Sequence, residues 1–261
     1  MPDTSKITCD TLLDLIGTPT CPILVDVCTK PDFAADPHLI PGAIRSSHSD
    51  LPQITRHLRG RSTIVLCQKG LKLSQGVAAW LRSEGICARY LEGGMNAWRD
   101  TAGAPRVPEA ALPDRREGAT LWAVPDDGHL ETGACVWLIR RFIDGEARIL
   151  HVSPDACAEV AQRFGAQALP RSPATFYALC EIFCLHTQPL DRLASVMRNT
   201  DTTQRDIAPE AAGVLAIWHG LSHRDPNDPA ALAVFDALYR WAKRKGHSGA
   251  SLSLTRGNTD V

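Results

Sequence analysis

The chain has 261 residues, of which 44% are hydrophobic and 22% are charged, a balance typical of soluble globular proteins. Its formal net charge of −1 gives no electrostatic basis for binding nucleic acid or a membrane surface, so neither partner is expected. No apolar run approaches the roughly 18 residues of a membrane span, and the first residues lack the basic start and apolar core of a secretion signal. We therefore expect a cytoplasmic protein.

The cysteine content fits a reducing compartment. Nine cysteines are scattered along the chain, an odd number without a short CxxC pair. Such cysteines are mostly free thiols, either buried or reactive, and the chain is long enough to build hydrophobic cores without disulfides.

Strand and helix patterns alternate over the first hundred residues and predict an α/β fold with a parallel sheet. Continuous aliphatic runs at 23–27 and 63–66 are typical of strands buried on both faces, and 88–91 is a third strand candidate. Apolar residues recur at helical spacing from Val77, which indicates an amphipathic helix between the last two strands.

The pattern changes after residue 102. Three prolines among small and charged residues predict a linker over 103–119, so the first domain covers 1–102. A second, mainly helical α+β domain is expected over 120–245, followed by a flexible, polar tail over 246–261. Its strands are predicted at 121–124 and 147–152, and its later helices at 174–185, 189–199, 209–221 and 228–245.

Cys67 is the strongest candidate for a reactive residue. It directly follows the strand predicted at 63–66, and a helical pattern begins a few residues later. Backbone N–H groups and the positive end of a helix both stabilise a thiolate, so this position suits a nucleophile. The alternative is a buried cysteine that acts only as a small apolar residue at a strand end.

Four segments together resemble a rhodanese homology domain over about residues 5–102. They are Leu-Val-Asp-Val at 24–27, Ile-Pro-Gly-Ala-Ile at 40–44, Val-Leu-Cys at 65–67 and Leu-Glu-Gly-Gly-Met-Asn-Ala-Trp at 91–98. The resemblance implies a rhodanese-like parallel sheet with flanking helices. It also implies that Cys67 attacks the outer sulfur of thiosulfate, releases sulfite and passes the sulfur on from a persulfide.

The resemblance further implies that the loop after Cys67 binds the donor through its backbone. The residues concerned are Gln68, Lys69, Gly70, Leu71, Lys72, Leu73 and Ser74. Lys69 and Lys72 would add positive charge for an anionic substrate. The expected partners are a small anionic sulfur donor and a thiol acceptor, and no cofactor is expected.

Two features depart from typical single-domain rhodaneses. Cys28 stands where an arginine usually follows the aspartate-containing strand, and no arginine occurs in the loop, where six residues separate Cys67 from Ser74. The loop is thus about one residue longer, as in phosphatase and arsenate-reductase relatives. We expect a pocket for a larger oxyanion, which leaves a Cys67-dependent reductase or phosphatase as an alternative function.

The second half resembles the C-terminal domain of ChrB-type chromate-resistance proteins from about Leu121 to Lys243. The segments that carry the resemblance lie at 133–144, 199–201, 208–213, 220–222 and 235–239. The resemblance implies a link to chromate or oxyanion stress. A protein that senses or binds chromate without turnover is therefore a further alternative.

Arg140 and Arg141 are candidate oxyanion-binding residues, because guanidinium groups form bidentate hydrogen bonds with oxyanions. The competing interpretation, which we favour, is a surface pair with one arginine bridged to Asp144 or Glu146.

Metal-ligand spacing occurs twice, in Cys180 and Cys184 with His186 beyond, and in His219 and His223. Because the two cysteines lie among large apolar residues, core positions are the better interpretation and no metal is expected. The acidic and histidine side chains at 126–131 are expected to be solvated loop residues.

Overall fold

The computed structural model describes residues 5–48, 50–170, 172, 174–198, 209–221 and 228–247. Of the tail predicted at 246–261, residues 246 and 247 instead end a helix, and the rest of the tail and His223 lie outside the described residues. Among the helices of the described ranges, none has the length and hydropathy needed to cross a bilayer.

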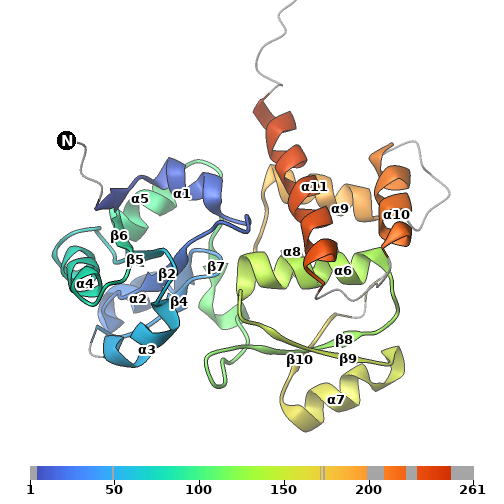
Figure 1. Cartoon of the computed structure of the whole chain (residues 1–261), viewed down its shortest axis with the longest axis horizontal. Helices are drawn as coiled ribbons and strands as arrows, with labels where there is room; N and C mark the ends of the chain where they lie inside the picture. Colours follow the sequence, from blue (N-terminus) through green and yellow to red (C-terminus); the bar gives the residue numbers. More distant parts are fainter. Residues whose placement is uncertain are drawn as a thin grey trace, which may run out of the picture.

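A five-stranded parallel sheet organises the first domain (Figure 1), as the sequence predicts. Its strands, in spatial order, are β1 (Lys6–Ile7), β6 (Ala88–Leu91), β5 (Thr63–Leu66), β2 (Ile23–Asp26) and β4 (Ile44–Arg45). The neighbouring interior strands β5 and β2 are the aliphatic runs, which are buried because helices cover both faces of the sheet.

The helices divide between the two faces of this sheet. Side chains of α3 (Leu51–Leu58) and α4 (Lys72–Ser83) pack with Val25 and Val65 on one face. On the opposite face lie α1 (Cys9–Leu15), α2 (Lys30–Ala35) and α5 (Gly94–Asp100). The core on this second face continues into the second domain.

The segment expected as a linker packs against the first domain. Within it, β7 (Val107–Pro108) pairs antiparallel with β3 (His38–Leu39), and a 3-10 turn, η1 (Glu109–Ala111), follows. The indole of Trp98 also donates to the carbonyl oxygen of Pro105 at 3.0 Å. Proline restricts this segment to extended backbone, which is compatible with an edge strand.

The second domain pairs a small parallel sheet with a group of helices. Strands β10 (Gln167–Ala168), β8 (Leu121–Pro125) and β9 (Arg148–Val152) form the sheet. Its helical segments are α6 (Leu130–Leu138), the π-helical η2 (Ile139–Ile143), the 3-10 turn η3 (Pro154–Ala156), α7 (Cys157–Phe164), α8 (Thr175–Ile182), α9 (Gln188–Arg198), α10 (Glu210–Gly220) and α11 (Pro229–His247). This is the mainly helical α+β composition that the sequence predicts.

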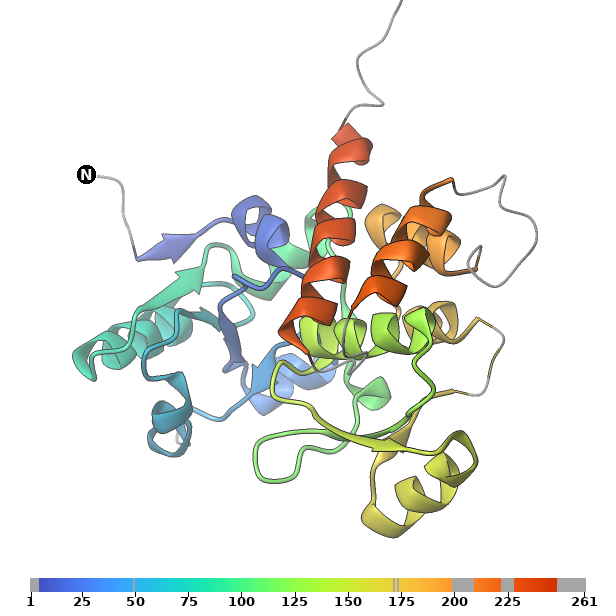
Figure 2. The same cartoon turned by 45° about the vertical axis from the view of Figure 1, so that its right-hand side comes forward.

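The two domains share one apolar core. The turn after α1 approaches α11 (Figure 2), and a Cβ on Gly17 would lie 2.8 Å from a ring carbon of Tyr239 and nearer still to Phe142. At the same place the ammonium of Lys243 donates to the carbonyl oxygens of Leu13 at 3.2 Å and Asp14 at 2.9 Å. These carbonyls belong to the last turn of α1, where a cation is favourable.

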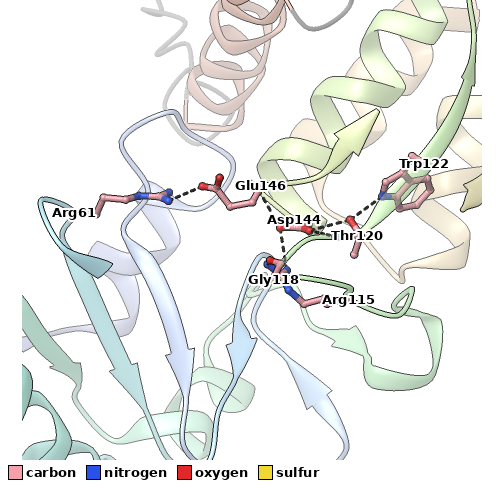
Figure 3. A network of polar contacts seen from close by, with 7 residues as sticks. All are labelled: Arg61, Arg115, Gly118, Thr120, Trp122, Asp144 and Glu146. Carbon is pink, nitrogen blue, oxygen red and sulfur yellow. Dashed lines mark hydrogen bonds and ion pairs between the residues drawn. The ribbon is translucent and has the colours of Figure 1, made fainter. Parts of the chain in front are cut away.

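A polar network marks a second contact between the domains (Figure 3). The buried carboxylate of Asp144 accepts from the backbone N–H of Thr120 at 2.7 Å, from its hydroxyl at 2.9 Å, and from Arg115 at 2.9 Å. Nearby, Arg61 of the first domain pairs with Glu146. Asp144 thereby fixes the end of the 103–119 segment to the second domain.

Candidate active site

Cys67 is the first residue after β5 and lies, 5% exposed, in the loop that leads to α4. Its carbonyl oxygen accepts from the backbone N–H of Met95 at 3.0 Å, and that of Gln68 accepts from Asn96 at 3.0 Å. The loop therefore rests on the first turn of α5, which follows the neighbouring strand β6. The end of β5 and the first turn of α5 therefore fix the backbone around the Cys67 thiol.

Two glycines make this close approach possible. Gly70 and Gly94 have φ angles of +65° and +62°, which L side chains rarely adopt. A Cβ on Gly70 would lie 2.7 Å from the backbone nitrogen of Gly93, and one on Gly94 would lie 2.9 Å from the carbonyl carbon of Gln68. Both positions need glycine because backbone packs directly on backbone.

Ser74 is the side chain that contacts the thiol. The Sγ of Cys67 donates to the Oγ of Ser74 at 3.0 Å, and that hydroxyl is 3.3 Å from the carbonyl oxygen of Leu71. A hydroxyl is both donor and acceptor, so it can turn to donate to the sulfur when the thiol ionises. Ser74 lies in the first turn of α4, whose N–H groups have no intrahelical acceptor.

The other predicted loop residues surround this thiol unevenly. Lys69, Leu71 and Lys72 are exposed, whereas Gly70 is buried. Gln68 and Leu73 are half-buried. Gln75 donates from its side-chain amide to the carbonyl oxygen of Gly70 at 3.3 Å. It holds the loop from inside the helix, at a position that no motif of the sequence marks.

Cys28, in the position of the usual arginine, carries no charge to the site. Burial, with the neighbouring Asp26 carboxylate, raises the pKa of the Cys28 thiol. Burial also raises the pKa of Asp26, which accepts from the backbone N–H of Cys28 at 2.7 Å. Arg45 is the cation beside these two residues, and its guanidinium lies 3.6 Å from the centre of the Phe33 ring. Its charge acts to lower the pKa of Asp26, but the effect of burial is larger and the pKa stays raised.

Arg140 and Arg141 are not a surface pair, and the predicted bridge to Asp144 or Glu146 is wrong. Both arginines are half-buried on η2. The guanidinium of Arg141 forms a bidentate pair with Asp236 of α11, at 2.8 and 2.9 Å, and the indole of Trp137 donates to the same carboxylate at 2.8 Å. Arg141 is therefore committed to a structural contact in the second domain, away from the Cys67 loop.

No group of metal-ligating side chains is present among the described residues. Cys180 is a core residue, and burial raises the pKa of its thiol to about 12. Cys184 is exposed beyond α8, and His186 lies 3.6 Å from Glu181. The core interpretation is thus confirmed for Cys180 and is wrong for Cys184, which follows the end of α8 in a turn open to solvent.

The loop at 126–131 is structural rather than merely solvated. Asp127 accepts from the backbone N–H of His129 at 2.9 Å and from the hydroxyl of Thr132 at 3.1 Å. Glu131 accepts from the backbone N–H of Phe176 at 2.9 Å. Carboxylates in these positions satisfy N–H groups at the starts of α6 and α8.

This architecture, a parallel sheet with a loop cysteine followed by a mainly helical domain, defines a two-part protein. The rhodanese-like domain family matches residues 8–101, and the family described as ChrB, C-terminal domain matches residues 122–242. The chain is therefore a rhodanese-like domain fused to a ChrB C-terminal domain, as the sequence resemblances imply.

Similar solved structures include a rhodanese-like domain protein from Staphylococcus aureus, 29% identical over 36% of this chain and 91% of that chain, with a TM-score of 0.32. A protein of unknown function from Rhodopseudomonas palustris, titled a possible tyrosine phosphatase, is 22% identical over 39% and 83% of the two chains, with a TM-score of 0.33. A thiosulfate sulfurtransferase from Pseudomonas aeruginosa is 17% identical over 83% and 52%, with a TM-score of 0.33. No curated protein matches the chain.

Proposed function

We propose that this protein is a rhodanese-type sulfurtransferase that uses Cys67 as its persulfide-forming nucleophile. The observation that carries the proposal is the position of Cys67, at the end of β5, in a loop pressed against α5 and 3.0 Å from the hydroxyl of Ser74. The family match over residues 8–101 supports the same class of chemistry.

In the proposed reaction the Cys67 thiolate attacks the outer sulfur of thiosulfate. A bond forms between the two sulfurs, the S–S bond of thiosulfate breaks, and its electron pair leaves with sulfite. The hydroxyl of Ser74 and the N–H groups at the start of α4 stabilise the thiolate before attack. Lys69 and Lys72, exposed beside the loop, attract the dianionic donor.

The second half of the reaction regenerates the enzyme. A thiolate acceptor attacks the outer sulfur of the Cys67 persulfide, takes that sulfur, and leaves Cys67 as a thiolate. We assign the acceptor to small thiols, and the physiological setting to chromate or oxyanion stress, because a ChrB C-terminal domain occupies residues 122–242.

The deciding experiment is treatment of the full chain with thiosulfate followed by intact mass analysis and peptide mapping. The expected result is a gain of one sulfur atom on Cys67, removed by a thiol and absent in Cys67→Ser. Cys87→Ser is the matched control, because Cys87 is an exposed thiol at the opposite end of the same sheet region, before β6.

Two other results would redirect the assignment. Hydrolysis of p-nitrophenyl phosphate or turnover of arsenate that depends on Cys67 would indicate a phosphatase or reductase. Saturable chromate binding without any modification or turnover would indicate a sensor.

A further inference from the structure

A pocket of about 290 Å³ lies between the two domains, away from the Cys67 loop. One wall is α1 and the turn after it, with Asp14, Thr18 and Pro19; the other is α11, from Asp236 to Arg244. This volume lies just below the range of about 300–1,000 Å³ typical of small-molecule sites, so the pocket suits a small ligand. The pocket is also where the two domains meet, a common place for ligand binding.

The charges around this pocket do not cancel. Three cations line it, Arg240, Lys243 and Arg244, against two carboxylates. Each carboxylate already has a cation, because Asp236 is paired bidentately with Arg141, and Asp14 acts on Lys243. Lys243 is itself held by the carbonyl oxygens at the end of α1.

Arg240 and Arg244 are therefore the surplus charges. They are one helical turn apart on α11, so their side chains share a face, and both are exposed. No ion pair or hydrogen bond joins either guanidinium to another residue within the described parts of the chain. Two guanidinium groups beside a pocket suit a phosphate- or sulfate-type anion, which accepts several hydrogen bonds at once.

Each wall also carries an apolar ring. The ring of Tyr239 and the ring of Pro19 line the pocket, and burial raises the pKa of the Tyr239 phenol further above neutrality. We infer that this interdomain pocket binds a small organic anion, with its phosphate- or sulfate-type group on Arg240 and Arg244 and its apolar part against Tyr239 and Pro19. The assignment does not depend on sulfur transfer at Cys67.

Calorimetric titration of the full chain with phenylphosphonate and with inorganic phosphate tests this site. We expect one saturable site per chain, and tighter binding of phenylphosphonate because inorganic phosphate lacks the apolar part. The double variant Arg240→Gln/Arg244→Gln is expected to weaken binding by about tenfold or more. Both side chains are exposed, so this variant keeps its fold, which its unliganded melting temperature checks.

Two matched variants locate the binding. Arg163→Gln removes an exposed arginine of α7 and is expected to leave both affinities unchanged. Lys69→Gln/Lys72→Gln removes the cations of the Cys67 loop and is also expected to leave them unchanged. The inference is overturned if the wild type shows no saturable binding, if the arginine double variant binds as the wild type does, or if binding disappears with Lys69 and Lys72 instead.

Discussion

The Sγ of Cys67 donates a hydrogen bond to the Oγ of Ser74, 3.0 Å away, across the loop that joins β5 to α4. In the thiol state Ser74 is the acceptor. In the thiolate state the hydroxyl can reverse its role and donate, so the same pair can hold Cys67 in both of its protonation states. Ser74 therefore contacts Cys67 through its side chain and does not contribute only a backbone N–H group to the loop.

Replacing Ser74 by alanine is expected to slow alkylation of Cys67 by iodoacetamide at neutral pH by about three- to tenfold, because the thiolate loses one hydrogen bond. Rates measured by mass spectrometry at Cys67 provide the check. Ser83→Ala is the control, since the Ser83 hydroxyl caps the same helix at the carbonyl oxygen of Trp80, 2.7 Å away. Equal rates in the two variants would remove Ser74 from the site.

Gly94→Ala is expected to abolish the reaction with thiosulfate and to lower the unfolding free energy by about 2–4 kcal/mol. The added methyl group would meet the backbone of Gln68 and Cys67, so the loop must move. Gly85→Ala is the matched control, because Gly85 has a φ of +79° but no atom within 4 Å of the added Cβ. It isolates backbone strain, about 1 kcal/mol. Denaturant unfolding measures the stability of both variants. Similar losses of unfolding free energy would show that the close backbone contacts of Gly94 are unimportant.

Asp144 and Glu146 lie on one turn but are expected to differ widely in importance. Asp144→Asn removes a buried charge that serves Thr120 and Arg115, with an expected loss of about 3 kcal/mol. Glu146→Gln breaks only the exposed pair with Arg61, with a loss of about 1 kcal/mol or less. Urea unfolding of both variants gives the comparison. Equal losses of unfolding free energy would mean that the buried contacts of Asp144 in Figure 3 stabilise the protein no more than the exposed pair of Glu146 does.

The stability contributed by Asp36 is expected to fall in acid. Burial acts to raise the pKa of this carboxyl, but hydrogen bonds from His38 and Arg106 outweigh it and hold the pKa below its ordinary value. The native state therefore binds the proton less readily than the unfolded state, whose pKa is about 3.9. The contribution is complete above about pH 5 and disappears as the pH falls through the lowered native value.

The measurement is the difference in unfolding midpoint between wild type and Asp36→Asn, followed from pH 7 down to about pH 3. This difference should shrink as the pH falls. A difference that stays constant with pH would show that the carboxylate charge contributes nothing to the contact between β3 and the segment at 103–119.

Much of the fold could be predicted from the sequence because local patterns decide it. The aliphatic run at 63–66 and the strand candidate at 88–91 coincide with β5 and β6, and the later helices of the second domain fall within a few residues of their predicted bounds. The two-residue strand β1 carries too short a pattern to be detected. Likewise β7 is predicted as linker, because prolines mask a strand that forms only by pairing with β3.

The details of the candidate site depended on contacts that no local pattern encodes. The partner of Arg141 is Asp236, which is 95 residues further along the chain, whereas the nearby acids at 144 and 146 serve other arginines. The break from α-helix to π-helix at Ile139 lies within a run that reads as one helix. In contrast, the place of Cys67 between β5 and α4 could be predicted, because strand end, loop and helix start are consecutive in the sequence.

The packing of Gly17 against Phe142 and Tyr239 bears on how the chain is made. Synthesis proceeds from the N-terminus, so the sheet that carries Cys67 is complete in sequence long before α11 leaves the ribosome. Until then the turn after α1 lacks the aromatic rings that cover it, and the last turn of α1 lacks the ammonium of Lys243. The face of the first domain that meets α11 therefore closes only once the second domain has been synthesised, and until then its apolar surface is exposed.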